Sequence, residues 1–223
     1  MPEGSVPAYE QAFETLRQFT RARRSTSPPV EHCELCSAGL AHGHPHLIEI
    51  VSRQMVCACD ACALLFDGKV GAKYKRVSRR VLCLANFELS DGQWESLLIP
   101  INMAFFFRSS PEGRMVALYP SPAGAVESLL PLEAWSEIAD SNPELQNLEP
   151  DIEALLVNRV GHAHGMARPE FYIAPIDECY KLVGLMRANW RGLSGGAEVW
   201  TEIADYFREL RSKAEMAGGG PNA

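Results

Sequence analysis

Two short cysteine pairs are the residues of this sequence whose type and spacing are best suited to chemistry. Cys33 and Cys36 form one Cys-x-x-Cys knuckle, and Cys59 and Cys62 form another after the 22 residues from 37 to 58. Thiolates in two such pairs can form a tetrahedral set of four sulfur ligands, which suits Zn²⁺ first and a single iron ion second. The spacing therefore predicts a metal site, with structural zinc as the simplest role.

Two further side chains near the knuckles are candidate substitutes among these ligands. Cys57 lies two residues before Cys59, so an extended chain would point both side chains to one side. Cys57 can replace a ligand, join a redox pair or be a small buried side chain, which is the commonest fate of a free cysteine. His46 ends the alternating series His42, His44 and His46 and abuts a strand-like stretch, so it is the best placed nitrogen donor.

The elements that must position these ligands are short. Residues 46–52 and 53–57 are rich in β-branched and apolar side chains and predict two strands that return the chain between the knuckles. This is the layout of a zinc ribbon or treble clef. We therefore expect a Cys-rich metal-binding module over residues 30–86, after an amphipathic helix and linker over residues 1–29.

A basic segment, residues 67–82, follows the second knuckle within an otherwise acidic chain of formal net charge −7. Such a segment can bind phosphate or an acidic protein partner, or it can be the solvated edge of a strand. The overall acidity, and the lack of aromatic residues in the segment beyond Tyr74, disfavour nucleic acid. The candidate partner-binding residues are Lys69, Lys73, Lys75, Arg76, Arg79 and Arg80.

Residues 87–214 predict an α+β domain. A short helix capped by Ser90 precedes a hairpin of strands 101–108 and 114–120, and the continuous apolar run of the first strand indicates burial on both faces. A second pair of strands, 154–160 and 170–175, precedes a helix over 176–190.

Both pairs show an apolar strand ending in Arg, a polar loop, a strand ending in Pro and then a helix. We interpret this as two strand-strand-helix units in which the residues after each proline, 121–124 and 176–178, flank a shared cleft, with chance similarity of two hairpins as the alternative. Gly192 and Ser194 are expected to end one helix and cap the next, over 197–214. Residues 215–223 predict a flexible tail.

Composition limits the class of protein. The 223 residues are 47% apolar and include an odd number of cysteines, seven, which fits a reducing compartment better than a disulfide framework. The most apolar run, 97–107, contains Pro100 and Asn102 and is too short to cross a bilayer of about 30 Å. No secretory signal or recognised catalytic motif is present, so we expect a cytoplasmic protein that is neither a membrane protein nor an enzyme.

Several motifs together resemble an uncharacterised bacterial family often encoded beside nickel-iron hydrogenase genes. They span roughly residues 30–214: Cys33-x-x-Cys36, His46-Leu, Cys57-x-Cys59-x-x-Cys62-x-Leu-Leu-Phe66, Ala104-Phe-Phe-Phe-Arg-Ser-Ser, Ala117-Leu-Tyr-Pro and Trp190-Arg-Gly-Leu-Ser-Gly-Gly196. The resemblance implies a non-enzymatic accessory role, with a hydrogenase subunit or maturation factor as partner. It supplies no catalytic residues.

Two alternatives belong to other classes of function. A rubredoxin-like electron carrier would bind iron with the same thiolates, but its knuckles usually continue with glycine, where this sequence has Ser37 and Ala63. That departure favours zinc. A zinc-ribbon regulator would bind nucleic acid, against the overall acidity.

Overall fold

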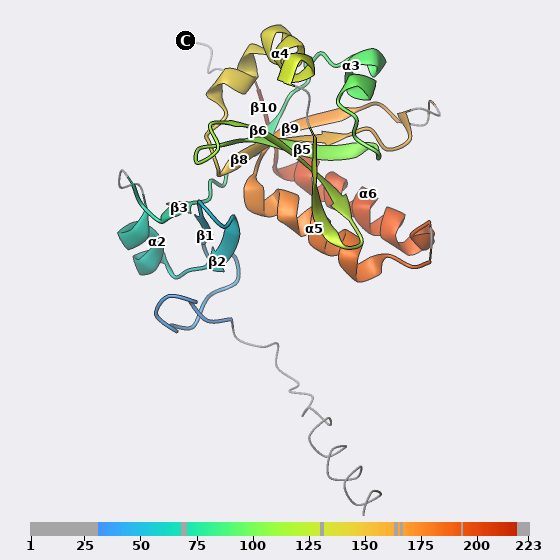
Figure 1. The fold of residues 1–223 in the computed structure, drawn as a ribbon. Helices are drawn as coiled ribbons and strands as arrows, with labels where there is room; N and C mark the ends of the chain where they lie inside the picture. The colour runs from blue at the N-terminus through green and yellow to red at the C-terminus, as the bar shows by residue number, and fades with distance from the viewer. Residues whose placement is uncertain are drawn as a thin grey trace, which may run out of the picture. The chain divides into compact units, whose positions relative to one another are not determined.

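A long antiparallel sheet forms the centre of the computed structural model, which describes residues 31–67, 71–129, 132–162, 165, 167–192 and 194–217. The predicted helix and linker over residues 1–29 lie outside these ranges. From His32 onward the described residues belong to one compact unit (Figure 1). Among them, no helix is both long and apolar enough to span a membrane.

Seven strands of the described chain form the large sheet in the order β10-β4-β9-β8-β5-β6-β7. All neighbours are antiparallel except β10 and β4. The strands are β4 (Leu82–Cys83), β5 (Met103–Ser109), β6 (Arg114–Ser121), β7 (Gly124–Ser128), β8 (Glu153–Asn158), β9 (Glu170–Pro175) and β10 (Glu215–Met216). The last of these pairs within the sheet, so the predicted flexible tail begins too early.

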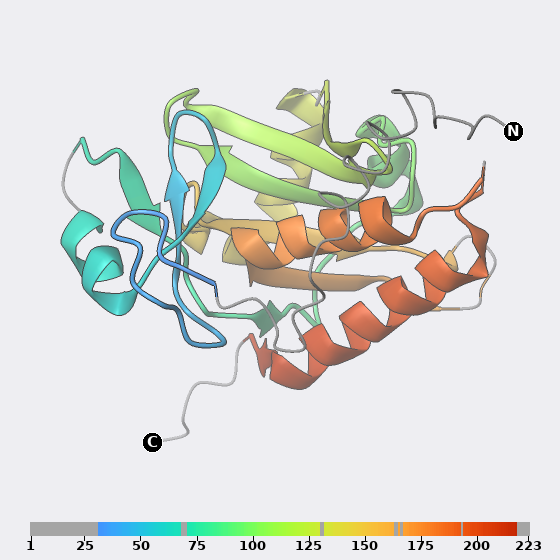
Figure 2. The same cartoon turned by 90° about the horizontal axis from the view of Figure 1, so that it is seen from below.

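Helices cover both faces of this sheet (Figures 1 and 2). Helices α5 (Ile176–Asn189) and α6 (Gly196–Lys213) pack on one face, and α3 (Asp91–Ser96), α4 (Leu132–Ser141) and the 3-10 helix η1 (Pro143–Asn147) pack on the other. Along β5, Phe105 and Phe107 enter the α5–α6 core, whereas Phe106 stacks on Trp135 of α4. The prediction that this strand is buried on both faces is confirmed.

Two hairpins, β5–β6 and β8–β9, meet at the centre of the sheet, where Phe106 lies opposite Leu155. Each is followed by a helix, α4 or α5, although β7 intervenes before α4 and the two helices cover opposite faces. Because β5 and β8 are antiparallel, the two hairpins point in opposite directions. Pro120 of β6 and Pro175 of β9 therefore lie at opposite ends of the strands. The predicted shared cleft beside these prolines is therefore wrong.

The described part of the Cys-rich module contains a second, three-stranded sheet and one short helix. Strands β1 (His46–Glu49) and β2 (Gln54–Cys57) form the expected hairpin, β3 (Tyr74–Arg76) pairs with β1, and α2 (Asp60–Phe66) follows the second knuckle. A knuckle, a hairpin and a helix in this order form a treble-clef-like arrangement. The chain enters the large sheet at β4, before the predicted module boundary at residue 86.

The hairpin of this module faces two cores, because successive side chains of a strand alternate between its faces. Leu47 and Val56 pack with Cys33 and Cys62 in the small core of the module. Ile48, on the opposite side of β1, is buried in the core beneath α5 and α6. The hairpin thus joins the candidate metal ligands to the large domain.

The turn before α6 differs from the sequence prediction. Gly195 occupies the N-cap position with φ 86°, and no side chain caps the helix there. A Cβ atom at Gly195 would lie 2.9 Å from Val199 Cγ1, so glycine meets both the conformational and the steric requirement. The prediction of a Ser194 cap is wrong. By contrast, the capping box at Ser90 is confirmed.

Candidate metal centre

The first knuckle is a tight turn that turns both of its thiols toward one point. Ser37 N donates to Cys33 O at 2.7 Å, and Cys33 N donates to Ala38 O at 2.8 Å. Ser37 has φ 63°, in the left-handed region that glycine usually occupies. The serine therefore adopts the conformation that a knuckle glycine would supply, and its presence does not open the turn.

The second knuckle is the start of a helix. Cys59 is the N-cap residue of α2, and its Sγ accepts a hydrogen bond from Cys62 N at 3.5 Å. A sulfur at an N-cap takes the place of the usual oxygen and satisfies an amide that has no partner within the helix. Cys62 lies in the first helical turn, so both thiols lie at the same helix end.

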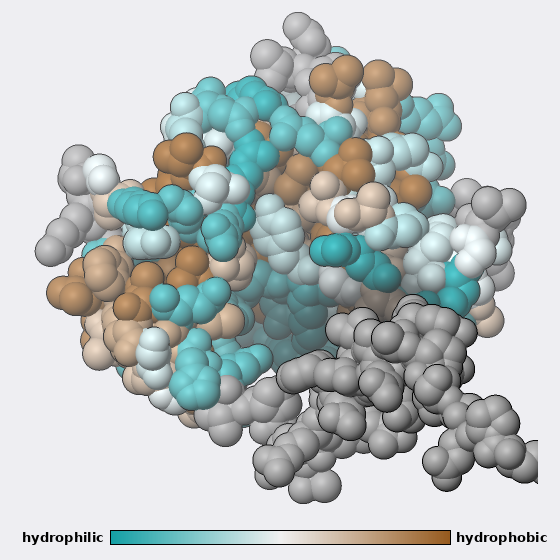
Figure 3. All heavy atoms as spheres, turned by 60° about the horizontal axis from the view of Figure 1, so that its bottom comes forward, coloured by the Kyte–Doolittle hydropathy of each residue, from teal (hydrophilic) through white to brown (hydrophobic). Residues whose placement is uncertain are grey.

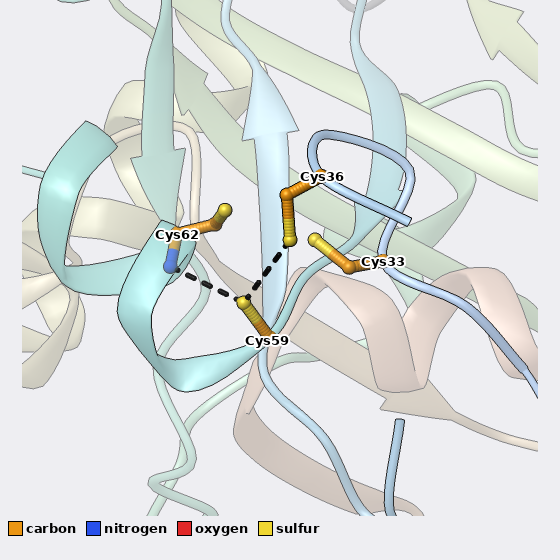
Figure 4. Close-up of side chains that lie close together, drawn as sticks. All are labelled: Cys33, Cys36, Cys59 and Cys62. Atoms are coloured by element: carbon orange, nitrogen blue, oxygen red, sulfur yellow. Dashed lines mark hydrogen bonds between the residues drawn. The ribbon is translucent and has the colours of Figure 1, made fainter. Parts of the chain in front are cut away.

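The four sulfur atoms converge as the spacing predicted (Figure 4). All lie within 4.8 Å of one another, and Cys36 Sγ and Cys59 Sγ are 3.7 Å apart. In a tetrahedral zinc site with Zn–S bonds of about 2.3 Å, neighbouring sulfurs are about 3.8 Å apart. No disulfide links the cysteines of the described chain. The cluster has the donor set and the size of a four-thiolate zinc site.

The electrostatics of the cluster also favour a cation. Burial raises the pKa of the Cys33 thiol, but hydrogen bonds from the backbone of Cys59, Leu35 and Cys36 outweigh it and lower the pKa to about 6. Burial, together with the neighbouring thiols, raises the pKa of Cys62 to about 12. Cys33 is therefore a thiolate at neutral pH whereas Cys62 keeps its proton, and a bound cation would favour the thiolate form of both.

The sequence of the chain matches one family among known protein families. A family model described as a family of unknown function (DUF5947) matches residues 32–214. The chain belongs to this family. No curated protein and no solved structure matches it. The family match begins just before Cys33 and includes both knuckles, so the candidate centre lies within the shared region.

The two predicted substitute ligands do not join the four-thiol cluster. Strand β2 ends at Cys57, and the chain then turns so that Cys59 can cap α2. Cys57 and His46 are grouped instead with His44, with one donor atom of each within 4.8 Å of the others. In the sequence, the alternation of His44 and His46 is the signal for this second group.

The basic segment lies against acidic groups and backbone oxygens of its own chain. Lys75 Nζ is 2.6 Å from Glu149, and Arg80 forms two hydrogen bonds, of 2.6 and 3.1 Å, with the buried carboxylate of Glu153. Lys73 pairs with Glu49 at 3.2 Å, Arg79 donates to Gly43 O at 2.6 Å, and the backbone N–H of Arg76 donates to Asp67. Lys69 lies outside the described residues. Partner binding by this segment stays a prediction.

A second polar group escaped the sequence analysis. Arg159, 4% exposed, forms an ion pair with Asp91, which also lies 3.1 Å from His162 Nε2. The Arg159 guanidinium lowers the pKa of Asp91. These residues line a cavity of about 660 Å³ with Trp94, over whose ring Arg159 lies. The carboxylate of Asp91 thus orients the ring of His162.

Proposed function

We propose that this protein is a zinc-binding, non-enzymatic accessory protein that binds a protein partner during assembly of a metalloenzyme, such as a nickel-iron hydrogenase. The observation that carries the proposal is the convergence of Cys33, Cys36, Cys59 and Cys62 at the spacing of a four-thiolate zinc site. Four protein ligands fill a tetrahedral shell and leave no position for a substrate, as in structural zinc sites. The centre therefore suits a binding module.

The surface that zinc would organise is the apolar side of α2. Leu64, Leu65 and Phe66 are 69, 61 and 39% exposed, and only the buried Ala63 separates them from Cys62. Two of the four ligands lie at the start of this seven-residue helix, which is too short to be stable alone. Metal binding would thus present these side chains in a fixed position. Apolar side chains gather on the module side of the molecule, at the left of Figure 3.

Such an exposed apolar cluster is typical of a surface that contacts another protein. Contacts with the large domain would hold it in a constant orientation, since Lys75 and Arg80 pair with Glu149 and Glu153. The partner is expected to cover α2 with an apolar surface of its own. The hydrogenase context comes from the family resemblance and stays a prediction.

Co-purification tests the proposal. The full chain with an affinity tag, expressed in its native host cells and recovered under reducing conditions, is expected to enrich hydrogenase subunits or maturation factors identified by mass spectrometry. The double variant Leu64→Ser/Leu65→Ser should lose that enrichment while it keeps its zinc. Leu129→Ser, which changes an exposed leucine outside the module, is the matched control and should retain the partner. Equal enrichment by the double variant, or none by the unaltered protein, would contradict the proposal.

A further inference from the structure

A second group of metal-binding side chains lies on the β1–β2 hairpin, beside the four-thiol cluster. His46 and Cys57 are directly opposite each other in the antiparallel pairing. The next pair outward carries the hydrogen bond, from Ala58 N to Pro45 O at 3.0 Å. Hydrogen-bonded and non-hydrogen-bonded pairs alternate in such a ladder, so His46 and Cys57 occupy a non-hydrogen-bonded pair, where side chains are closest.

His44 completes the group from the same segment. It lies two residues before His46, so an extended chain points both rings to one side. The ring centroids are 5.0 Å apart and nearly perpendicular. One nitrogen of each ring and Cys57 Sγ all lie within 4.8 Å of one another. Two imidazoles and a thiol have therefore been brought to one point by the geometry of the hairpin.

The hydrogen bonds of the two rings assign their tautomers. His44 Nδ1 lies 3.1 Å from Ala41 O, and a carbonyl oxygen can only accept, so Nδ1 carries the hydrogen. His46 Nδ1 lies 2.6 Å from Asp177 Oδ2, and the carboxylate likewise accepts. When each ring is neutral, its lone pair is then on Nε2. Metal-binding histidines are held in this way, with the second nitrogen donating to a carbonyl or a carboxylate.

We propose that His44, His46 and Cys57 form a second metal site for Zn²⁺ or a similar divalent ion of the first transition series. Two imidazoles and a thiolate suit such borderline ions. Three protein ligands leave a fourth position for water or an exogenous ligand, as in exchangeable and catalytic zinc sites. This distinguishes the site from the four-thiolate centre, which is closed.

Asp177 is the positioning residue of this site. It lies in the first turn of α5, 131 positions from His46 in sequence, and its other carboxylate oxygen accepts from Glu178 N at 2.8 Å. Both oxygens are therefore engaged, and the carboxylate fixes the orientation of the His46 ring. Glu34 holds strand β2 at Cys57. The carboxylate of Glu34 accepts a hydrogen bond from Cys57 N at 2.5 Å, and the backbone N–H of Glu34 donates to Cys57 O.

Metal counting with a spectroscopic probe tests the proposal. The full chain is stripped of metal, loaded with one equivalent of Zn²⁺ to fill the four-thiolate centre, and titrated with Co²⁺ under reducing anaerobic conditions. We expect one further equivalent of Co²⁺ to bind, with tetrahedral visible bands and a thiolate charge-transfer band. The intensity of that band should be about a quarter of that given by the four-thiolate centre, since one thiolate ligand replaces four.

Variants separate this site from its neighbour. Cys57→Ser and His44→Gln should abolish the second Co²⁺ equivalent, whereas Cys83→Ser and His42→Gln, which change a remote thiol and an exposed histidine of the same loop, should retain it. Asp177→Asn should weaken the binding of Co²⁺ to the second site about 10- to 100-fold without removing the charge-transfer band. Circular dichroism checks that each variant is folded.

Two outcomes would overturn the second site: a total of one metal per chain that Cys36→Ser removes and Cys57→Ser leaves in place, or a second equivalent that survives both Cys57→Ser and His44→Gln. Failure of the four-thiolate centre gives a different result. In that case one metal would still bind, and Cys57→Ser rather than Cys36→Ser would remove it.

Discussion

Replacing Cys36 by serine perturbs the metal centre with little effect on packing, because Cys36 is the exposed member of the four-thiol cluster. Zinc binding to structural sites of this kind contributes about 10–16 kcal/mol at neutral pH. Shared equally among four thiolates, one ligand accounts for about 2.5–4 kcal/mol, or roughly a hundred- to a thousandfold in affinity. We expect Cys36→Ser to weaken zinc binding by that factor.

The same variant should loosen a defined part of the module. The first knuckle, at Cys33 and Cys36, and α2 depend directly on the metal. The hairpin between them is also held by the large domain, because Ile48 anchors β1 in its core and His46 contacts Asp177. At a zinc concentration that saturates the unaltered protein but not the variant, the amides of Ser37 and Ala63 should exchange hydrogen at nearly the rate of an unfolded chain. The exchange rates of amides in β5 and β8 should differ by less than about tenfold between the variant and the unaltered protein.

Competition with a chromophoric zinc chelator measures the affinity, and hydrogen exchange followed by mass spectrometry measures the local opening. Cys83→Ser is the control, because it removes a thiol outside the cluster. A loss of affinity below about tenfold, or equal protection of the knuckle in both proteins, would refute the role assigned to Cys36.

Two further predictions concern pH and stability. Zinc binding should displace at least the protons of Cys36 and Cys62, whose pKa values are raised in the metal-free cluster, so the apparent dissociation constant should fall by at least about a hundredfold per pH unit near neutrality. Calorimetry in buffers of different ionisation enthalpy counts the protons released. Arg80→Ala leaves the buried carboxylate of Glu153 without its cation, so it should lower the free energy of unfolding, measured in urea, by about 3 kcal/mol. The control Arg208→Ala, at an exposed ion pair, should lower that free energy by less than about 1 kcal/mol. Equal effects of the two variants would contradict the assigned burial.

The sequence was most informative where the determining contacts are local. Cysteines three positions apart fall within one turn, whether that turn is the loop at Cys33 or the first turn of α2, and the hairpin between them follows from β-branched residues. The apolar run of β5 likewise indicated a strand covered on both faces, because burial on both faces removes the usual alternation.

Contacts between distant parts of the chain could not be predicted in this way. The partner of His46 is Asp177, and the partners of Lys75 and Arg80 are Glu149 and Glu153, all in the later domain. These pairs depend on how the module packs against the sheet, which no local spacing encodes. Cys57 stays outside the four-thiol cluster for a local reason, because the chain turns after Cys57 so that Cys59 caps α2, and it does not stay extended as far as Cys59.

X-ray absorption at the zinc edge of the Cys57→Ser variant tests the central claim most directly, because that variant keeps only the four-thiolate centre. Protein purified anaerobically from cells supplied with both zinc and iron should be colourless, contain one zinc per chain and show four sulfur neighbours at about 2.3 Å. A red protein with one iron per chain that bleaches reversibly on reduction would favour an electron carrier. Fewer than four sulfur neighbours, or less than about half an equivalent of metal, would contradict the proposed zinc centre.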